Sequence, residues 1–423
     1  MIILDINKLL HGKSCSCGKE HTCPVKYVYI EKNATGRLAE ICICHKNLLI
    51  VADENTFAAA GDRVLSVLSD KCIKKVIFSG KEILVPDEKA IDKVTSALDG
   101  TDLIIGIGSG VIQDLCKYVS HFNSVPYMIV ATAPSMDGYA SDGAAMITGG
   151  MKVTYPAGLP VAIIADTSVI KDAPEDMLKS GYGDIIGKFS ALNDWKLSHV
   201  INKEYFCEYI YNLTYEQITR TIALADGILK RDEECIAALM EALVVIGILM
   251  SFAGSSRPAS GSEHHLSHFF EITGILDDTP YFSHGTDVAY STYETARLRE
   301  KILAEKFPSE IFRLSDEEYS SVMNSIYKTS ANGCIQLQKK AGNYSKNRAA
   351  VYLEKEAEIR KVLAEMPSSE EIKNLLARLE LYTDDFYTFY GEEKIQNAVL
   401  YAKDLKDRYT VLWLNYDFYG GSI

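Results

Sequence analysis

The sequence predicts a chain of two parts: an α/β domain with a parallel sheet over residues 1–170, and an all-α domain over residues 171–423. Its 423 residues are more than one ordinary hydrophobic core serves, which favours two domains. Between about residues 40 and 170, short β-branched runs alternate with amphipathic stretches. This βαβα order is typical of a parallel sheet covered by helices. After Asp172 the β-branched runs thin out, and helical periodicity continues through Leu412.

The predicted strands are short apolar runs bounded by Gly, Pro, Asp or Ser, as buried parallel strands are. They lie at residues 47–52, 75–78, 103–107, 127–131 and 162–165. Amphipathic stretches at residues 56–68 and 88–98 predict helices between them. Residues 144–155 interrupt the order, and the Gly149-Gly150 pair at their centre predicts an inserted β-hairpin.

The helical part is punctuated by prolines, which favour helix boundaries. They stand at positions 174, 258, 280, 308 and 367. One apolar run, residues 235–253, is interrupted by Glu241, and we interpret it as a buried core helix and not a membrane span. The first residues do not have the pattern of a signal peptide, so we expect a cytoplasmic protein.

Charge and cysteine content narrow the class further. The formal net charge of -13 argues against a nucleic-acid partner, because phosphate binding is carried by clustered Lys and Arg. Ten cysteines in a long chain without an export signal favour reduced thiols. The local cluster Cys15, Cys17, His21 and Cys23 has donors that suit zinc, but its C-x-C start is tighter than the usual spacing. A cysteine-rich hairpin is the favoured interpretation, and zinc stays an alternative.

A glycine-rich turn follows the predicted strand at 103–107. It reads Gly106-Ile107-Gly108-Ser109-Gly110 and leads into a predicted helix. Glycines at such a turn let the backbone approach a pyrophosphate, and the helix N-terminus offers N–H groups. Val111 stands where G-x-G-x-x-G has its third glycine, so the ordinary dinucleotide fingerprint is absent.

A second loop, residues 132–138, leaves the next strand at the same predicted sheet edge, where parallel sheets bind ligands. The two loops together favour a nucleotide site. Asp53 comes directly after the first predicted strand, residues 47–52. Its carboxylate either accepts hydrogen bonds from an adenosine ribose or caps the following helix, and both interpretations stay open.

A metal site is indicated by histidine placement. Four of the nine histidines fall between positions 264 and 284, and His264 and His268 share a helix face. With Asp184, the imidazoles of His264 and His284 form the donor set of an open catalytic site for a divalent cation. Each residue also has a structural explanation, since Asp184 could cap its helix, so spacing alone leaves both interpretations open.

Five motifs occur in order along the chain: GIGSGVIQDLCKY, TAPSMDGYAS, ADTSVIKDAPEDMLKSGYGDIIGK, SRPASGSEHHLSH and SHGTDVAY. Together they resemble the bacterial type of glycerol-1-phosphate dehydrogenase, within the iron-containing alcohol dehydrogenase and dehydroquinate synthase-like superfamily. The resemblance implies a dehydroquinate synthase-like fold, with an active site in the cleft between a nucleotide-binding domain and a helical metal-binding domain.

The resemblance also implies residue roles. Asp184, His264 and His284 match the metal ligands, Asp137 matches a residue placed by the substrate hydroxyls, and His268 matches a pocket histidine that does not ligate. Asp137, Asp184 and His268 are therefore the expected catalytic residues. The expected contacts with NAD(H) or NADP(H) are Asp53, Gly106, Gly108, Ser109, Gly110, Asp114, Thr132, Ser135 and Ser141.

Lys188 stands where some superfamily members carry a fourth, histidine ligand, which favours zinc or nickel over iron. The implied reaction is the reversible reduction of dihydroxyacetone phosphate to sn-glycerol 1-phosphate by a homodimeric enzyme. Lys188 and Arg257 are candidate phosphate contacts, although a role in ion pairing is equally compatible with each. The alternatives are a glycerol or polyol dehydrogenase, a dehydroquinate synthase-type cyclase and a non-catalytic binding protein.

Overall fold

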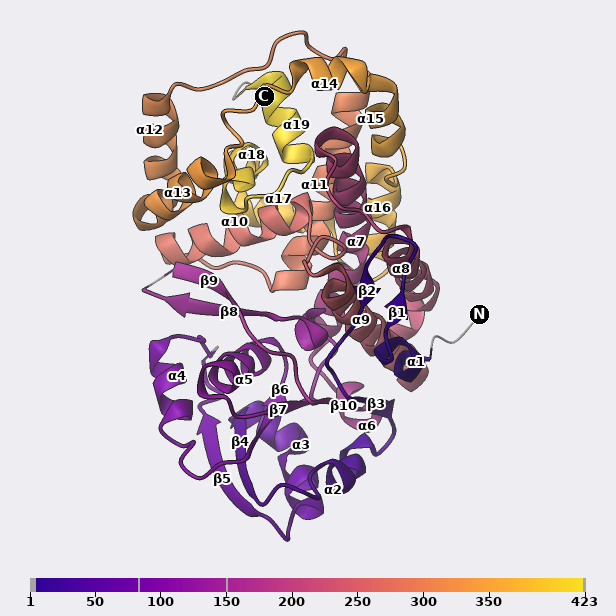
Figure 1. Cartoon of the computed structure of the whole chain (residues 1–423), viewed down its shortest axis with the longest axis vertical. Coiled ribbons are helices and arrows are strands. Elements are labelled where there is room, and N and C mark those ends of the chain that lie inside the picture. The colour runs from indigo at the N-terminus through magenta and orange to yellow at the C-terminus, as the bar shows by residue number, and fades with distance from the viewer. Residues whose placement is uncertain (1–4, 83, 150, 421–423) are drawn as a thin grey trace. The chain divides into compact units, whose positions relative to one another are not determined.

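The computed structural model describes residues 5–82, 84–149 and 151–420. Strands alternate with helices up to strand β10 (Ala162–Asp166), and the described residues after it are helical or loop (Figure 1). The predicted α/β region followed by an all-helical region is therefore confirmed.

The chain forms two compact units. Unit 1 comprises Met1–Tyr182 and Thr219–Ser256, and unit 2 comprises Gly183–Ile218 and Arg257–Ile423. These units differ from a simple division near residue 170, because part of the helical region belongs to unit 1. The domain boundary at residue 170 stays a prediction.

Unit 1 contains a six-stranded sheet in which every neighbouring pair is parallel. The spatial order is β3 (Tyr27–Glu31), β10, β7 (Tyr127–Ala131), β6 (Leu103–Gly108), β4 (Asn47–Asp53) and β5 (Cys72–Phe78). From β4 the chain first adds β5 on one side and then returns to add β6 on the other. The direction of winding thus reverses between β4 and β6, and ligands of such sheets bind beyond the strand ends at this point.

Both faces of the sheet are buried, which explains the continuous apolar runs of its central strands. On one face, alternate residues such as Ile50 and Ile105 pack with Val64 of helix α3 (Glu54–Val67). Helix α5 (Gly110–Asn123) follows β6 and packs on the other face, where its Leu115 is buried. The remaining elements of this part are α1 (Ile6–Leu10), η1 (Ala34–Arg37), α2 (Leu38–Ile41), α4 (Glu88–Thr95), η2 (Gly138–Ala140) and α6 (Thr167–Ile170).

All five predicted strands are present, and the inserted hairpin is found as β8 (Gly143–Thr148) and β9 (Met151–Pro156). The sequence interpretation missed β3. This edge strand carries exposed Tyr27 and ends at Glu31, so it lacks the continuous apolar pattern of its neighbours. A second hairpin near the N-terminus pairs β1 (Lys13–Ser14) with β2 (Glu20–His21).

The helical region begins with α7 and α8, which each pass from one unit into the other. Its helices are α7 (Glu175–Asn202), α8 (Glu208–Ile228), α9 (Glu233–Ala253), α10 (Ser262–Asp277), α11 (His284–Ala304), α12 (Asp316–Tyr327), η3 (Lys328–Ser330), α13 (Ala331–Ala341), α14 (Ala349–Glu354), α15 (Glu356–Leu363), α16 (Ser369–Ala377), α17 (Thr383–Tyr390), α18 (Glu392–Tyr401), η4 (Ala402–Leu405) and α19 (Val411–Tyr419). All five prolines predicted to mark boundaries lie outside these helices.

Helix α9 is the apolar run that was interpreted as a core helix. It is long and apolar enough to cross a membrane by length and composition, but 78% of its apolar window is buried inside the protein. Asp232 caps its start and Gly254 its end. The helix is therefore a buried core helix, as predicted, but it belongs to unit 1 and not to a separate helical domain.

Candidate functional site

The three predicted metal ligands come together in unit 2. Asp184 lies on α7, His264 in the first turn of α10, and His284 at the first position of α11. One ligand atom from each residue lies within 4.8 Å of those of the other two. The Nε2 atom of His264 is 3.6 Å from Oδ1 of Asp184. One carboxylate and two imidazoles at this spacing have the donor chemistry of a zinc-type site with room for a further ligand.

Two glycines explain how α7 and α11 approach closely enough to bring Asp184 to His284. A Cβ atom on Gly183 would lie 2.4 Å from the carbonyl oxygen of Gly285 and 2.7 Å from Cβ of Ala289. A Cβ atom on Gly187 would lie 2.4 Å from a methyl group of Val288. The G-x-x-x-G spacing places both glycines on one helix face, on either side of Asp184 along the chain.

Glu263 orients His264. The Nδ1 atom of His264 donates to Oε1 of Glu263 over 2.7 Å, and the same oxygen accepts from the backbone N–H of Gly261 at 2.8 Å. The Nε2 atom is thereby left as the ligand atom of the ring. Burial raises the pKa of Glu263, while the nearby Lys188 ammonium and the hydrogen bond from Gly261 act in the opposite direction. A carboxylate that holds the far nitrogen of a ligating histidine is a common support in metal sites.

Asp194 holds the start of α10, and with it His264. Its Oδ2 accepts from the backbone N–H of Ser262 at 2.6 Å, and its Oδ1 is paired with Arg299 of α11 at 2.8 Å. Oδ1 also accepts from the backbone N–H of Val411 at the start of α19. Burial raises the pKa of Asp194 although the Arg299 charge lowers it. One fully buried carboxylate therefore joins four helices of unit 2 beside the ligands.

The remaining histidine, His268, lies one turn after His264. Its ring stacks on that of His284, with centroids 5.7 Å apart and an interplanar angle of 27°. The Oγ atom of Ser267 lies 3.4 Å from Nδ1 of His284. His268 is thus half-buried beside the three ligands, where the resemblance assigned it a non-ligating role.

The two candidate phosphate contacts are both engaged in ion pairs. Lys188 is fully buried, one turn after Asp184, and its Nζ donates to Oδ1 of Asp184 at 2.5 Å. Arg257 is 4% exposed and pairs with Glu204, and it also donates to the backbone carbonyl of Tyr409 at 2.8 Å. These pairs give each cation a structural role, and their contact with a substrate phosphate stays a prediction.

The glycine-rich turn of unit 1 lies where the winding of the sheet reverses. Gly108 ends β6, Ser109 is the N-cap of α5, and Gly110 begins that helix. A Cβ atom on Gly108 would lie 2.7 Å from Cβ of Ile112, so the absence of a side chain lets the helix start directly against the strand. The first N–H groups of a helix have no partner within it and suit a phosphate.

The second loop leads away from β7 at the same edge of the sheet. Thr132 donates its backbone N–H to the carbonyl of Gly108, and the carbonyl of Ser135 accepts from the hydroxyl of Ser180. Asp137 is buried and is the N-cap of η2. Both loops that were predicted to contact a nucleotide are therefore neighbours in unit 1.

Lys117 connects α5, the helix that follows the glycine-rich turn, to the carbonyl of Gly138 at the end of the second loop, and the sequence interpretation missed it. This fully buried lysine of α5 is paired with Asp114 at 3.3 Å. It also donates to the hydroxyl of Ser141 at 3.3 Å and to the carbonyl of Gly143 at 2.8 Å. One ammonium group thereby holds both Asp114 and Ser141. The spacing of residues along the chain gave no indication of this contact.

Asp53 is the N-cap of α3. Its Oδ1 accepts from the backbone N–H groups of Asn55 and Thr56 at 2.8 and 2.9 Å, and the Asp53 backbone N–H donates to Oγ1 of Thr56. The capping interpretation is therefore observed. Both of these bonds end on Oδ1, and contact of the carboxylate with a ribose stays a prediction.

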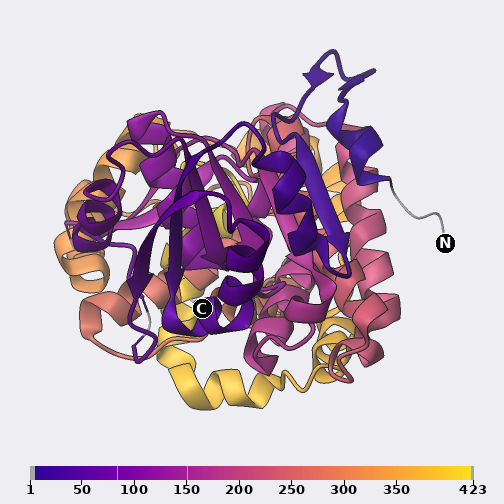
Figure 2. The ribbon, with the colours of Figure 1, turned by 90° about the horizontal axis from the view of Figure 1, so that it is seen from below.

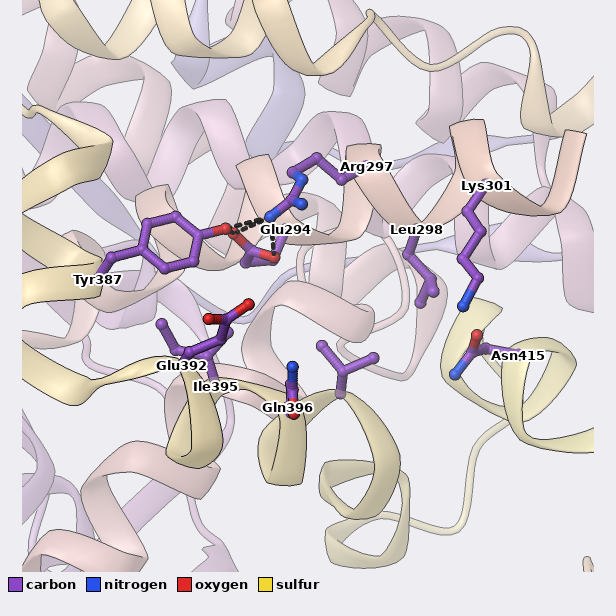
Figure 3. Close-up of a pocket in the computed structure, with 10 residues that line it drawn as sticks. Glu294, Arg297, Leu298, Lys301, Tyr387, Glu392, Ile395, Gln396 and Asn415 are labelled. Atoms are coloured by element: carbon purple, nitrogen blue, oxygen red, sulfur yellow. Dashed lines mark hydrogen bonds and ion pairs between the residues drawn. The ribbon is translucent and has the colours of Figure 1, made fainter. Parts of the chain in front are cut away.

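A separate pocket of unit 2, with a volume of about 250 Å³, is lined by side chains of α11, α17, α18 and α19 (Figure 3). Glu294 and Arg297 of α11 and Tyr387 of α17 form a hydrogen-bonded group on its wall (Figure 3). Burial raises the pKa of Glu294 against the opposing effects of Tyr387 and Arg297. None of the lining residues identified in the described part of the chain is a predicted site residue.

Comparison with known proteins decides the family. Residues 29–174 match the family model described as iron-containing alcohol dehydrogenase. A protein of Halalkalibacterium halodurans named glycerol-1-phosphate dehydrogenase (NAD(P)+) is 36% identical over 328 residues, which cover 75% of this chain and 80% of that protein. The chain belongs to the iron-containing alcohol dehydrogenase family.

Two further similarities extend over nearly the whole chain. A protein of Bacillus licheniformis with the same name is 28% identical over 410 residues, covering 94% of this chain and 91% of that protein. Among solved structures, a variant of an archaeal halo-thermophilic alcohol dehydrogenase from a Red Sea brine pool aligns with a TM-score of 0.60. It is 14% identical and covers 97% of this chain and 95% of that one, so it supports the fold alone. The family membership makes this chain a metal-dependent dehydrogenase that uses NAD(P).

Proposed function

We propose that this dehydrogenase reduces dihydroxyacetone phosphate to sn-glycerol 1-phosphate with NADH or NADPH, and also carries out the reverse oxidation. The observation that carries the proposal is the agreement of two long alignments, over 75% and 94% of the chain, with proteins named glycerol-1-phosphate dehydrogenase. The grouping of Asp184, His264 and His284 supports the metal dependence of this chemistry.

Asp184, His264 and His284 are the proposed metal ligands, and their fit rests on the oriented donor set. When bound, the cation would supply the Lewis acid that polarises the ketone, and the nicotinamide would supply the hydride. Asp137 is the proposed contact of the substrate hydroxyls. His268 is the proposed donor of the proton that the ketone oxygen gains, because it is half-buried and stacks against the ligand His284.

Zinc or nickel is the proposed metal. Some superfamily members place a fourth histidine ligand one turn after the aspartate, and this chain has Lys188 there. Lys188 is fully buried and already paired with Asp184, so that position supplies a cation in place of a ligand. A site of three protein donors leaves coordination positions for water and substrate, as catalytic zinc sites do.

The proposed cofactor contacts are the turn Gly106, Gly108, Ser109 and Gly110 with the groups around it, namely Asp53, Asp114, Thr132, Ser135 and Ser141. The proposal is supported by the reversal of winding between β4 and β6, because Asp53 ends β4 and the glycine-rich turn spans the end of β6 and the start of α5. We further propose that the enzyme is a cytoplasmic homodimer. Substrate phosphate contacts at Lys188 and Arg257 would require their ion pairs with Asp184 and Glu204 to rearrange.

The test is a coupled substrate and metal assay on the full chain. Metal-free protein is reconstituted with zinc, nickel or iron, and oxidation of NADH and NADPH is followed with dihydroxyacetone phosphate, dihydroxyacetone and other ketones. We expect turnover only with the phosphorylated ketone, and a product that sn-glycerol 3-phosphate dehydrogenase does not oxidise. Preference for the unphosphorylated ketone would favour a glycerol or polyol dehydrogenase instead.

The ligand assignment is tested by Asp184→Ala. Loss of the carboxylate removes a ligand, so we expect the kcat/KM of metal-dependent turnover to fall by at least about 100-fold. Loss of a group that only supports a ligand lowers activity by up to about this factor. Full activity of Asp184→Ala, or of wild-type protein after removal of the metal with a chelator, would contradict the assignment.

A further inference from the structure

The N-terminal hairpin of unit 1 holds a second group of metal-type donors, which the proposed reaction does not use. It is drawn in indigo in Figures 1 and 2 and comprises β1, the turn that follows, and β2. The Sγ atoms of Cys15 and Cys17 and a ring nitrogen of His21 all lie within 4.8 Å of one another. Thiolates and imidazoles are the donors that zinc prefers in structural sites.

The turn geometry explains how the C-x-C spacing brings its donors together. The backbone N–H of Gly18 donates to the carbonyl of Cys15, and the N–H of Cys15 donates to the carbonyl of Lys19. Gly18 has a φ of +86°, a value that favours glycine. A three-residue hairpin loop that ends in a glycine bulge has this pattern. The tight turn therefore places both cysteines at the turn end of the hairpin, and His21 lies on the returning strand β2.

His21 is oriented as a ligand. It is fully buried, and its Nδ1 lies 3.0 Å from the backbone carbonyl oxygen of Phe252 at the end of α9. A carbonyl only accepts, so Nδ1 carries the proton in this contact and Nε2 carries the lone pair. The Phe252 ring stacks on the imidazole, with centroids 5.3 Å apart and an angle of 13°. A backbone carbonyl on the far nitrogen is the usual support of a zinc-bound histidine.

The distance between donors also fits. The Nε2 atom of His21 lies 3.5 Å from Sγ of Cys17. In a tetrahedral site with zinc–sulfur near 2.3 Å and zinc–nitrogen near 2.0 Å, neighbouring donors lie roughly 3.5 Å apart. A single cation bound by both atoms would thus need little movement of either side chain.

We infer that Cys15, Cys17 and His21 supply three of the ligands of a structural zinc ion at the hairpin of unit 1, separate from the proposed catalytic metal. The hairpin is joined to the end of α9 by two further bonds, from Lys19 to the carbonyl of Ala253 and from Ser251 to the carbonyl of Thr22. Zinc would fix the turn of the hairpin that rests on this helix end. Binding requires both thiols as thiolates, so two protons leave when the ion enters a neutral dithiol site.

Cys23 is the matched control within the same segment. It is the remaining cysteine of the sequence cluster, but it is not a member of the donor group found among the described residues. Cys23 is buried and lies two residues after His21. Cys23→Ser therefore removes a buried thiol of the same segment and leaves the proposed donor group intact.

The experiment uses the full chain loaded with Co²⁺ in place of zinc, because thiolate ligands give cobalt intense sulfur-to-metal absorption bands that oxygen and nitrogen donors lack. Wild-type protein and Cys23→Ser are expected to show the bands. The double variant Cys15→Ser/Cys17→Ser is expected to lose them and to contain one zinc ion fewer per chain. Asp184→Ala is expected to keep them, so the result is independent of the proposed dehydrogenase activity.

Absence of the bands in wild-type protein, or their persistence in the double variant, would overturn the site. Circular dichroism identifies a double variant that fails to fold. In that case, X-ray absorption at the zinc edge of the wild-type protein decides, because a thiolate site gives a zinc–sulfur shell near 2.3 Å. A zinc spectrum with only nitrogen and oxygen neighbours would refute the proposal on its own.

Discussion

Individual imidazoles in this protein are oriented from the nitrogen that faces away from the proposed metal. Glu263 accepts from Nδ1 of His264, and the Phe252 carbonyl accepts from Nδ1 of His21. The acceptor differs in charge, and this difference has a functional consequence. A carboxylate makes the ring more basic and strengthens its bond to a metal, whereas a carbonyl mainly fixes the tautomer and orientation.

Glu263→Gln therefore tests the support of the proposed catalytic metal. The variant keeps the length of the side chain but removes the charge opposite His264, so we expect metal affinity to fall about 10- to 100-fold. Metal titration monitored by NADH oxidation measures this, and saturating metal should restore most of kcat. Glu271→Gln on the same helix is the control. Equal metal affinity in the two variants would show that Glu263 has only a packing role.

Glu294 supplies a prediction about pH. Burial raises its pKa, so the folded chain binds this proton more tightly than the unfolded chain does. Its contribution to stability is therefore fully present below the unfolded pKa, about 4.3, and is lost as pH rises through the folded pKa. In denaturant unfolding, the stability of wild type relative to Glu294→Gln should fall over this window, by at most about 1.4 kcal/mol per pH unit.

Tyr387→Phe should extend the pH dependence of stability that Glu294→Gln removes. The Tyr387 hydroxyl lowers the pKa of Glu294, so its removal raises that pKa and extends the window of falling stability to higher pH. A Tyr387→Phe profile that parallels wild type would mean that the tyrosine does not stabilise the Glu294 carboxylate.

At the scale of elements, the proposed metal site depends on how closely helices α7 and α11 pack. Gly183 and Gly187 make that approach, and they lie on the segment that carries Asp184. His284 is the first residue of α11, where a small displacement of the helix moves the ligand directly. Helix spacing and ligand spacing are thus set by the same contact.

Gly183→Ala should affect stability and metal binding together. The new methyl group would meet the Gly285 carbonyl and the Ala289 side chain, and such overpacking costs about 1–3 kcal/mol. Gly333→Ala on α13 is the matched control, because nothing lies within 4 Å of its Cβ position. There alanine should stabilise by up to about 1 kcal/mol through helix propensity. Unfolding curves and metal titrations of both variants measure the changes in stability and in metal affinity. A Gly183→Ala protein with unaltered metal affinity would show that ligand spacing does not depend on this helix contact.

The sequence was informative about elements and less so about the contacts between them. Central strands such as β4 and β6 follow from their continuous apolar runs, whereas edge strand β3 has a mixed pattern and was missed. The grouping of Asp184 with two histidines was predicted from residue type and motif order. Lys117 and Asp194 could not be predicted as supports, because a buried charge is recognised only from partners distant in sequence.

At the scale of the whole molecule, the two kinds of proposed binding residues belong to different compact units. The nucleotide turn and the loop at residues 132–138 lie in unit 1, and Asp184, His264 and His284 lie in unit 2. Each ligand should therefore stabilise its own unit first. A ligand at 100 times its Kd adds about 2.7 kcal/mol to the stability of the state that binds it.

Hydrogen exchange measured by mass spectrometry tests this division. NADH alone should slow exchange in peptides that cover the start of α5 and residues 132–138, since the amides there are the proposed phosphate contacts. Zinc or nickel alone should slow exchange in peptides that contain the starts of α10 and α11, where His264 and His284 lie. The double variant Cys15→Ser/Cys17→Ser keeps this second effect separate from the hairpin. If the catalytic ligands are assigned correctly, the metal still slows exchange at α10 and α11 in that double variant, but no longer does so in Asp184→Ala. The reverse result would mean that the slowed exchange at α10 and α11 comes from metal bound at the hairpin.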